Sequence, residues 1–198
     1  MVRALLFDLG NVLVGLDFDR AYRAAAEISP FSADEIRERL AGLDLATPYE
    51  CGLIDSAEFF ERCRDGLQLD IDYEGFRSLW GDMFQDTPLL DQGWLEGLAS
   101  DFPLVILSNT NELHMDWIRA RYSILQPFHA LTLSYEVGVM KPGAEIYQAA
   151  VEASGCAPGQ CFFVDDKPEN VDGARALGIR AEVFEDAESL RSQIAALC

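Results

Sequence analysis

Short apolar runs recur along the chain and are rich in Leu, Val, Ile and Phe with little polar alternation. Continuous runs of this length are typical of strands that are buried on both faces, as in a parallel sheet. They cover residues 3–7, 103–107, 130–134, 161–164 and 179–184. The pattern therefore predicts a parallel sheet that is covered on both faces.

Amphipathic helical patterns fill the stretches between the later runs. A proline or a capping residue opens most of them, and Gly155 and Gly178 close two. The expected helices span residues 88–100, 111–122, 142–154, 168–177 and 187–197. An alternation of strands and helices predicts a doubly wound, Rossmann-like α/β fold.

One segment, residues 18–84, contains no convincing strand. Its periodicity instead predicts helices over residues 18–28, 32–41, 55–67 and 72–84. The segment follows the first strand, and parallel sheets bind ligands at the carboxyl ends of their strands. We therefore expect a helical cap at residues 17–85 over an α/β core at residues 1–16 and 86–198.

Composition limits the partners of the chain. A net charge of −19 over 198 residues repels nucleic acid and anionic membranes, so a phosphate site must supply positive charge locally. The five cysteines form no CxxC pair and are expected to be free thiols in a reducing compartment. No signal-peptide pattern is found at the N-terminus, which favours a cytoplasmic protein.

Polar groups stand directly after several predicted strands or before a helix. Asp8 lies in FDLGNVL, Ser108 in LSNTN, Lys141 in GVMKP, and Asp165 and Asp166 in FFVDDKPEN. Each alone is an ordinary turn or surface residue. In a parallel sheet, however, all of them would meet at the edge where a ligand crevice forms.

Their chemistry suits phosphoryl transfer. Three carboxylates that converge need a cation, and hard oxygen ligands favour Mg²⁺. A carboxylate such as Asp8 can attack phosphorus and form an acyl phosphate. Ser108 offers a hydroxyl to a phosphoryl oxygen, Lys141 offers positive charge, and a helix that begins near Asn111 offers N–H donors.

In this order and spacing, the four motifs resemble those of the haloacid dehalogenase superfamily, and the resemblance runs from residue 7 to residue 174. The insert resembles the small cap of that superfamily's first subclass. The phrases FDLGNVLVGLDFDR, LSNTNELH and FFVDDKPENVDGA are most similar to the bacterial α-D-glucose-1-phosphate phosphatase branch. The resemblance implies a Mg²⁺-dependent phosphatase of small phosphorylated metabolites, with sugar phosphates as the favoured class.

The resemblance also implies a role for each motif residue. Asp8 matches the nucleophile and a metal ligand, Gly10 a carbonyl ligand of the metal, Ser108 and Asn109 the phosphate-binding turn, Lys141 the lysine that steadies the intermediate, Asp166 a direct metal ligand, Asp165 an outer-shell ligand, and Asn170 a supporting residue.

Gly10 departs from the superfamily pattern. Most of its phosphatases carry an Asp two residues after the nucleophile, which serves as general acid and base, and glycine has no side chain for that work. Asp17 could reach back from the cap, although it also suits the N-cap of a helix. Alternatively, water or the substrate supplies the proton, or the enzyme favours better leaving groups such as anomeric sugar phosphates.

Rival functions remain open at this level. A 2-haloacid dehalogenase would not need the Asp165-Asp166 pair, a phosphomutase would want a firm acid and base, and a binding or regulatory protein on this fold is supported by Gly10 alone.

We expect the cap to set specificity and place His114 outside the site. The candidate cap residues are Asp17, Phe18, Tyr22, Tyr49, Glu50 and Cys51, with the loop 48–52 most exposed to substrate.

Overall fold

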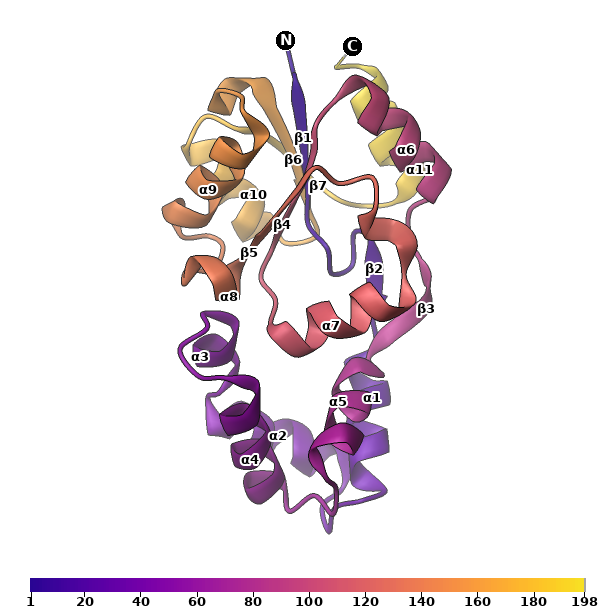
Figure 1. Ribbon diagram of the computed structural model, residues 1–198, viewed down its shortest axis with the longest axis vertical. Coiled ribbons are helices and arrows are strands. Elements are labelled where there is room, and N and C mark those ends of the chain that lie inside the picture. The colour runs from indigo at the N-terminus through magenta and orange to yellow at the C-terminus, as the bar shows by residue number, and fades with distance from the viewer. Residues whose placement is uncertain (198) are drawn as a thin grey trace.

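A computed structural model describes residues 1–197. Five parallel strands form the central sheet in the order β5-β4-β1-β6-β7, which confirms the predicted doubly wound α/β fold (Figure 1). The strands are β1 (Ala4–Phe7), β4 (Leu104–Ser108), β5 (Ala130–Leu133), β6 (Cys161–Asp165) and β7 (Arg180–Val183). The chain leaves β1 toward β4 and later returns to its other side at β6, so the topological switch point lies at β1.

The sheet is apolar on both faces because its central strands alternate side chains between two cores. Leu5 and Phe7 pack on one side, whereas Ala4 and Leu6 pack on the other. The first face is covered by α6 (Gln92–Asp101), α7 (Glu112–Arg121) and α11 (Ala187–Ala195), and the second by α9 (Ala144–Ser154) and α10 (Pro168–Ala176). This double burial explains the continuous apolar runs in the sequence.

Five helices between β2 and β3 form a separate bundle at one end of the molecule (Figure 1). Their apolar faces enclose a third core, in which Phe59 stacks on Tyr49 at a centroid distance of 4.1 Å and packs beside Phe76. The helices are α1 (Phe18–Ala26), α2 (Ala33–Leu43), α3 (Ala46–Glu50), α4 (Ser56–Leu67) and α5 (Tyr73–Gly81).

An antiparallel ribbon that the sequence did not predict joins this bundle to the sheet. It pairs β2 (Val14–Leu16) with β3 (Phe84–Pro88). The expected helices over 72–84 and 88–100 were therefore too long, since α5 ends at Gly81 and α6 begins at Gln92 after its cap Asp91. The strand signal was weak because β2 has three residues and the middle of β3 is exposed.

Four short helical segments were also not predicted. The segment expected to be a loop at 48–52 instead ends a one-turn helix, α3. Another turn, α8 (Ser134–Val137), follows β5, and two 3₁₀ turns lie at Ser123–Leu125 and Pro158–Gln160. Such short helices leave no amphipathic period to detect.

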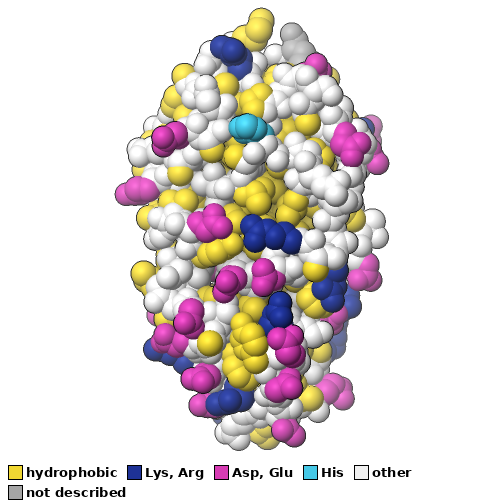
Figure 2. Space-filling view, viewed as in Figure 1, with side chains coloured by type: hydrophobic (Ala, Val, Ile, Leu, Met, Phe, Trp, Pro, Cys, Tyr) yellow, Lys and Arg dark blue, Asp and Glu magenta, His cyan; other side chains and the backbone are white. Residues whose placement is uncertain are grey.

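The surface of the described chain agrees with the charge of its sequence. Acidic side chains are spread over the face in Figure 2, and Lys and Arg side chains are interspersed among them. Between residues 1 and 197, no helix combines the length and apolar character that a bilayer crossing requires. Cys51, Cys63, Cys156 and Cys161 are free thiols, and Cys198 lies outside the described residues.

Candidate active site

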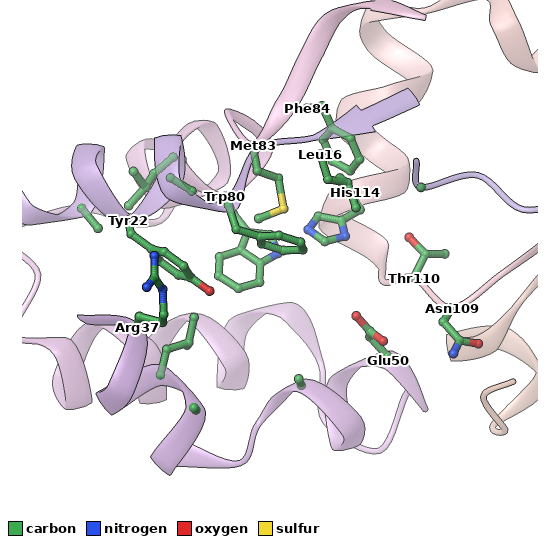
Figure 3. Close-up of a pocket in the computed structure, with 18 of the residues that line it drawn as sticks. Leu16, Tyr22, Arg37, Glu50, Trp80, Met83, Phe84, Asn109, Thr110 and His114 are labelled. Carbon is green, nitrogen blue, oxygen red and sulfur yellow. The ribbon is translucent and has the colours of Figure 1, made fainter. Parts of the chain in front are cut away.

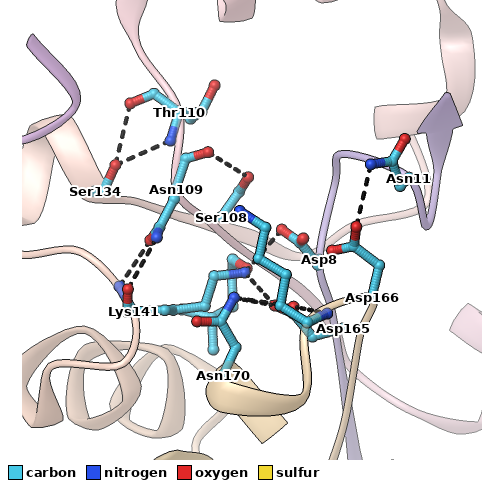
Figure 4. A network of polar contacts seen from close by, with 12 residues as sticks. Asp8, Asn11, Ser108, Asn109, Thr110, Ser134, Lys141, Asp165, Asp166 and Asn170 are labelled. Atoms are coloured by element: carbon cyan, nitrogen blue, oxygen red, sulfur yellow. Dashed lines mark hydrogen bonds and ion pairs between the residues drawn. The ribbon is translucent and has the colours of Figure 1, made fainter. Parts of the chain in front are cut away.

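The predicted carboxylates meet at the carboxyl edge of the sheet (Figure 4). Asp8 follows β1, where its N–H continues the ladder by donating to the carbonyl of Val164 at 2.9 Å. Asp165 ends β6 and Asp166 follows it. Carboxylate oxygens of Asp8, Asp165 and Asp166 all lie within 4.8 Å of one another. Because β1 and β6 are adjacent parallel strands that end at one edge, their pairing brings these groups together.

Lys141 reaches into the same point from the loop before α9. Its Nζ lies 2.8 Å from Oδ1 of Asp8 and 2.6 Å from Oδ2 of Asp165, and it also donates to the carbonyl of Leu107 at 2.8 Å. An ammonium has three N–H donors, so all three are used. The buried Lys141 is thereby held in one orientation between the two carboxylates.

The turn after β4 is tied to the Lys141 loop. The side-chain amide of Asn109 accepts from the N–H of Lys141 at 2.7 Å and donates to its carbonyl at 3.0 Å. Ser108 is buried beside it, and its hydroxyl makes only a long 3.4 Å bond to the carbonyl of Asn109. The Ser108 hydroxyl therefore retains the capacity to donate to a ligand.

The two neighbouring aspartates differ in environment. Asp165 is fully buried and accepts from Nζ of Lys141 and from the N–H of Lys167 at 2.9 Å. Both of its carboxylate oxygens also accept from Nδ2 of Asn170, at 2.9 and 3.1 Å. Asp166 is half-buried and accepts from Nδ2 of Asn11 at 3.1 Å. Asp165 is thus occupied by protein donors, whereas Asp166 keeps an oxygen available for a cation.

Asn11 is a site residue that sequence reasoning missed. It adopts a left-handed conformation, with φ of 56°, in the tight turn after β1, where Asn is tolerated better than most residues. Its side-chain oxygen accepts from the N–H of Leu16 at 3.0 Å while its amide holds Asp166. The signal was present in the sequence as the Gly10-Asn11 pair, because both residue types are favoured in turns.

The electrostatic balance of the cluster calls for a second cation. Burial raises the pKa of Asp8 to about 6, Lys141 opposes this rise, and Asp165 adds to it. One ammonium faces three carboxylates, which leaves net negative charge in a buried place. All available ligands are hard oxygens, so the donor set fits Mg²⁺.

A family comparison agrees with this geometry. The sequence model of the haloacid dehalogenase-like hydrolase family matches residues 2–178 of the chain. The chain belongs to this family. The prediction of an enzyme of the superfamily is confirmed, and the predicted assignment to phosphoric monoester hydrolases agrees with the names of its relatives below.

Two curated proteins illustrate the relationship. The hydrolase is 26% identical to D-ribitol-5-phosphate phosphatase of Bacteroides thetaiotaomicron, over 98% of this chain and 97% of that protein. It is 27% identical to a phosphatase of Mycobacterium tuberculosis, over 98% of this chain and 92% of the relative. The finer resemblance to the α-D-glucose-1-phosphate phosphatase branch stays a prediction.

Solved structures share the fold of the hydrolase. A haloacid dehalogenase family enzyme from Bacteroides thetaiotaomicron, solved as a magnesium complex, superposes with a TM-score of 0.85 at 29% identity, covering 98% of each chain. The L-2-haloacid dehalogenase from Xanthobacter autotrophicus gives a TM-score of 0.66 at 20% identity, covering 99% of this chain and 83% of its own. This second likeness concerns the fold alone.

A cavity of about 410 Å³ opens from the carboxyl edge of the sheet into the helical bundle (Figure 3). Gly10, Ser108 and Asn109 line one end, and the helices α1, α2 and α5 line the other. Among the candidate specificity residues, Phe18, Tyr22 and Glu50 belong to its walls. Tyr49 and Cys51 do not, because Tyr49 is buried in the core of the bundle.

Asp17, the acid considered for proton transfer, and Glu50 lie in different environments. Asp17 is the N-cap of α1, where its carboxylate accepts from the N–H of Arg20 at 3.0 Å, and it does not line the cavity. Glu50 lies in the cavity near Asn109 (Figure 3). Burial raises the pKa of Glu50, Lys167 opposes this rise, and the charge of Asp8 adds to it.

His114, which the sequence left out of the list of site residues, also lines the cavity. It is buried between two aromatic rings, stacked on Trp80 at 5.7 Å and edge-on to Phe84 at 5.0 Å. A lone histidine one turn into a helix carries no sequence signal for such a place, because Trp80 and Phe84 come from a distant segment.

Proposed function

We propose that this hydrolase is a magnesium-dependent phosphatase of small phosphorylated metabolites that works through an aspartyl-phosphate. The supporting observation is the juxtaposition of Lys141 with Asp8 inside a cluster of three carboxylates. It places a buried nucleophile beside a fixed positive charge and a set of hard oxygen ligands. The magnesium complex of the similar Bacteroides structure supports the same metal.

In this proposal Asp8 attacks phosphorus through one carboxylate oxygen. The new P–O bond forms as the ester P–O bond breaks, and the alcohol leaves with a proton. Water then attacks the acyl phosphate, which releases inorganic phosphate and restores the carboxylate. Lys141 neutralises charge on Asp8 and on the phosphoryl group, while Ser108 and Asn109 donate to phosphoryl oxygens.

Asp8, Asp166 and the carbonyl of Gly10 are the proposed ligands of Mg²⁺. When bound, the ion supplies positive charge that holds and polarises the phosphoryl group. Asp165 and Asn170 act as positioning residues, because their hydrogen bonds fix Lys141 and the loop that carries Asp166.

Glu50 is the proposed surrogate for the missing acid at Gly10. It shares the cavity with Ser108 and Asn109, and its raised pKa favours a protonated carboxyl group that can protonate the leaving alcohol. Asp17 is a less suitable donor because its carboxylate caps α1. We further propose that residues 17–85 form a cap domain, consistent with their separate core, and that this cap excludes water from the acyl phosphate.

Phosphate release from sugar phosphates, nucleotides and p-nitrophenyl phosphate, with Mg²⁺ and with EDTA, tests the proposal. Release that depends on the metal supports it, and release led by sugar phosphates supports the finer prediction of substrate class. Chloride release from 2-chloropropionate without metal, in the absence of phosphate release, would favour the dehalogenase alternative. Failure of both reactions would favour a binding protein.

A further inference from the structure

Two buried ring nitrogens beside the cavity, one from α5 of the bundle and one from α7 of the sheet part, have no partner. Within residues 1–197, Nε1 of Trp80 and Nε2 of His114 are the buried side-chain polar atoms without a hydrogen bond. Both residues line the cavity that opens from the catalytic edge (Figure 3). Since buried polar groups are nearly always bonded, these two atoms indicate where a ligand supplies acceptors.

Asn111 fixes the protonation of the His114 ring. As N-cap of α7, its Oδ1 accepts from the backbone N–H of His114 at 3.0 Å, which sets the orientation of the amide. Its Nδ2 then lies 3.0 Å from Nδ1 of His114 and must donate to it. Nδ1 is therefore the acceptor of the ring, and the proton is on Nε2. Burial lowers the pKa of His114 to about 3, so the ring is neutral at ordinary pH.

The walls around these donors are apolar and partly flat. The parallel ring planes of Trp80 and His114 differ by 11°, and Phe84 stands edge-on to His114. Most lining side chains of the bundle are small or aliphatic, namely Ala21, Ala25, Ile36, Leu40, Leu79 and Met83, while Tyr22 and Arg37 bring polar groups to the part away from Asn109 (Figure 3). A polyol carries more hydroxyl groups than these few polar side chains can pair, whereas a largely apolar body leaves fewer groups without partners.

We infer that the cavity takes the alcohol portion of a phosphomonoester that is largely apolar and carries a hydrogen-bond acceptor, such as a carbonyl oxygen or ring nitrogen. The phosphate lies at Asp8, and the acceptor reaches Trp80 and His114. The inference rests on the proposed phosphatase function. It departs from the sugar phosphates that the sequence resemblance favoured, because the walls of the cavity are largely apolar. The ligand must supply an acceptor, because an indole N–H can only donate and a neutral Nε2–H does the same.

Three primary alkyl phosphates with similar leaving groups test this inference: ribitol phosphate, phenylpentyl phosphate and pyridylpentyl phosphate. Because the reacting centres match, their kcat/KM values report the cavity rather than the chemistry. The kcat/KM of the pyridyl ester is expected to exceed that of the phenyl ester by about fivefold, which corresponds to one net hydrogen bond. The kcat/KM of the phenyl ester is expected to exceed that of ribitol phosphate.

Variants identify the donors. Trp80→Phe keeps an aromatic ring but removes N–H, and His114→Asn keeps a partner for Asn111 but removes Nε2. Combined, they are expected to bring the ratio of pyridyl to phenyl ester close to one. Trp94→Phe, on α6 outside the cavity, is the matched control and keeps the ratio. Thermal melts show whether the double variant folds. If it does not fold, the pyridyl-to-phenyl ratio of kcat/KM is measured in each single variant, and a ratio that falls in neither overturns the inference.

The two levels of the proposal fail in different ways. Equal kcat/KM for the pyridyl and phenyl esters, or a higher value for ribitol phosphate, overturns the inference while the phosphatase function stands. If no ester is hydrolysed, the phosphatase function fails. Calorimetric binding of the same three esters to Asp8→Asn protein then tests the cavity directly, with the same order of affinities expected.

Discussion

Nζ of Lys141 lies 2.8 Å from Oδ1 of Asp8, and the same ammonium also contacts Asp165. The pair is buried, so neither charge is screened by solvent. Two carboxylates already compete for one ammonium before Asp166 is counted. This shortage of positive charge underlies the first two predictions.

Magnesium is expected to stabilise the protein against heat. An ion held at 100 times its Kd adds about 2.7 kcal/mol to the free energy of unfolding, and its removal by EDTA reverses the gain. Asp166→Asn is expected to reduce the Mg²⁺-dependent rise in Tm sharply. The matched control is Asp172→Asn, because Asp172 is exposed on α10. An equal rise in both variants would remove Asp166 from the metal site.

Metal-free Asp8→Asn is expected to be more stable than the wild type above pH 6. Burial raises the pKa of Asp8 from 3.8 to about 6, so its stabilising contribution is complete below pH 3.8 and is lost as the pH rises through about 6. Asn avoids this loss, which is on the order of 3 kcal/mol. Urea unfolding in EDTA should show a higher free energy of unfolding for the variant than for the wild type at neutral pH, and this difference should close toward pH 4. A difference that widens in acid would contradict burial as the cause of the raised pKa.

The same Asp8→Asn variant is expected to lose phosphatase turnover completely. The amide is nearly isosteric with the carboxylate but cannot form the acyl phosphate. Phosphate release and circular dichroism measured on one preparation separate loss of chemistry from loss of fold. Turnover close to that of the wild type would show that another group attacks phosphorus.

Glu50→Gln is expected to lower kcat for alkyl phosphates by more than about tenfold. The loss should be much smaller for p-nitrophenyl phosphate, because its leaving group needs little protonation. Asp17→Asn serves as the comparison, since Asn caps a helix about as well as Asp and the variant is expected to keep both its stability and its kcat. If Asp17→Asn lowers kcat for alkyl phosphates and Glu50→Gln does not, Asp17 is the acid.

Gly52→Ala is expected to disturb the docking of α3 on the sheet domain. Gly52 has φ of +65°, and a Cβ there would lie 2.3 Å from the carbonyl oxygen of Tyr135. The backbone must move, and Glu50 moves with it. Activity is expected to fall together with stability, whereas Gly42→Ala, with open space around its Cβ inside α2, is expected to keep activity and to raise stability by about 0.5–1 kcal/mol. Kinetics and thermal melts on both variants provide the check.

Much of the fold could be predicted because each buried strand is a continuous apolar run. The position of Asp8, Ser108 and Asp165 after such runs also predicted their convergence, since parallel strands share one carboxyl edge. Lys141 was harder to place by pattern alone, because it reaches the site from a loop. Its three contacts, with Asp8, Asp165 and Leu107, join segments that are far apart in sequence.

The remaining features depend on contacts that a local pattern does not record. Whether His114 is a surface residue or a wall of the cavity depends on Trp80 and Phe84, which lie 34 and 30 residues earlier in the chain. The choice between Asp17 and Glu50 likewise depends on how the bundle docks. Short strands such as β2 and β3 are stabilised by each other and have little apolar pattern of their own.

The β2–β3 ribbon has a consequence for how this chain can change. Val14 pairs with Pro88, so the chain leaves for the bundle and returns from it at adjacent positions, one strand spacing apart. A tight turn could bridge that gap, which makes the intervening segment excisable in principle. Grafting a foreign helical bundle onto the same two strands would then exchange selectivity wholesale, while the carboxylates and the lysine beneath keep their geometry.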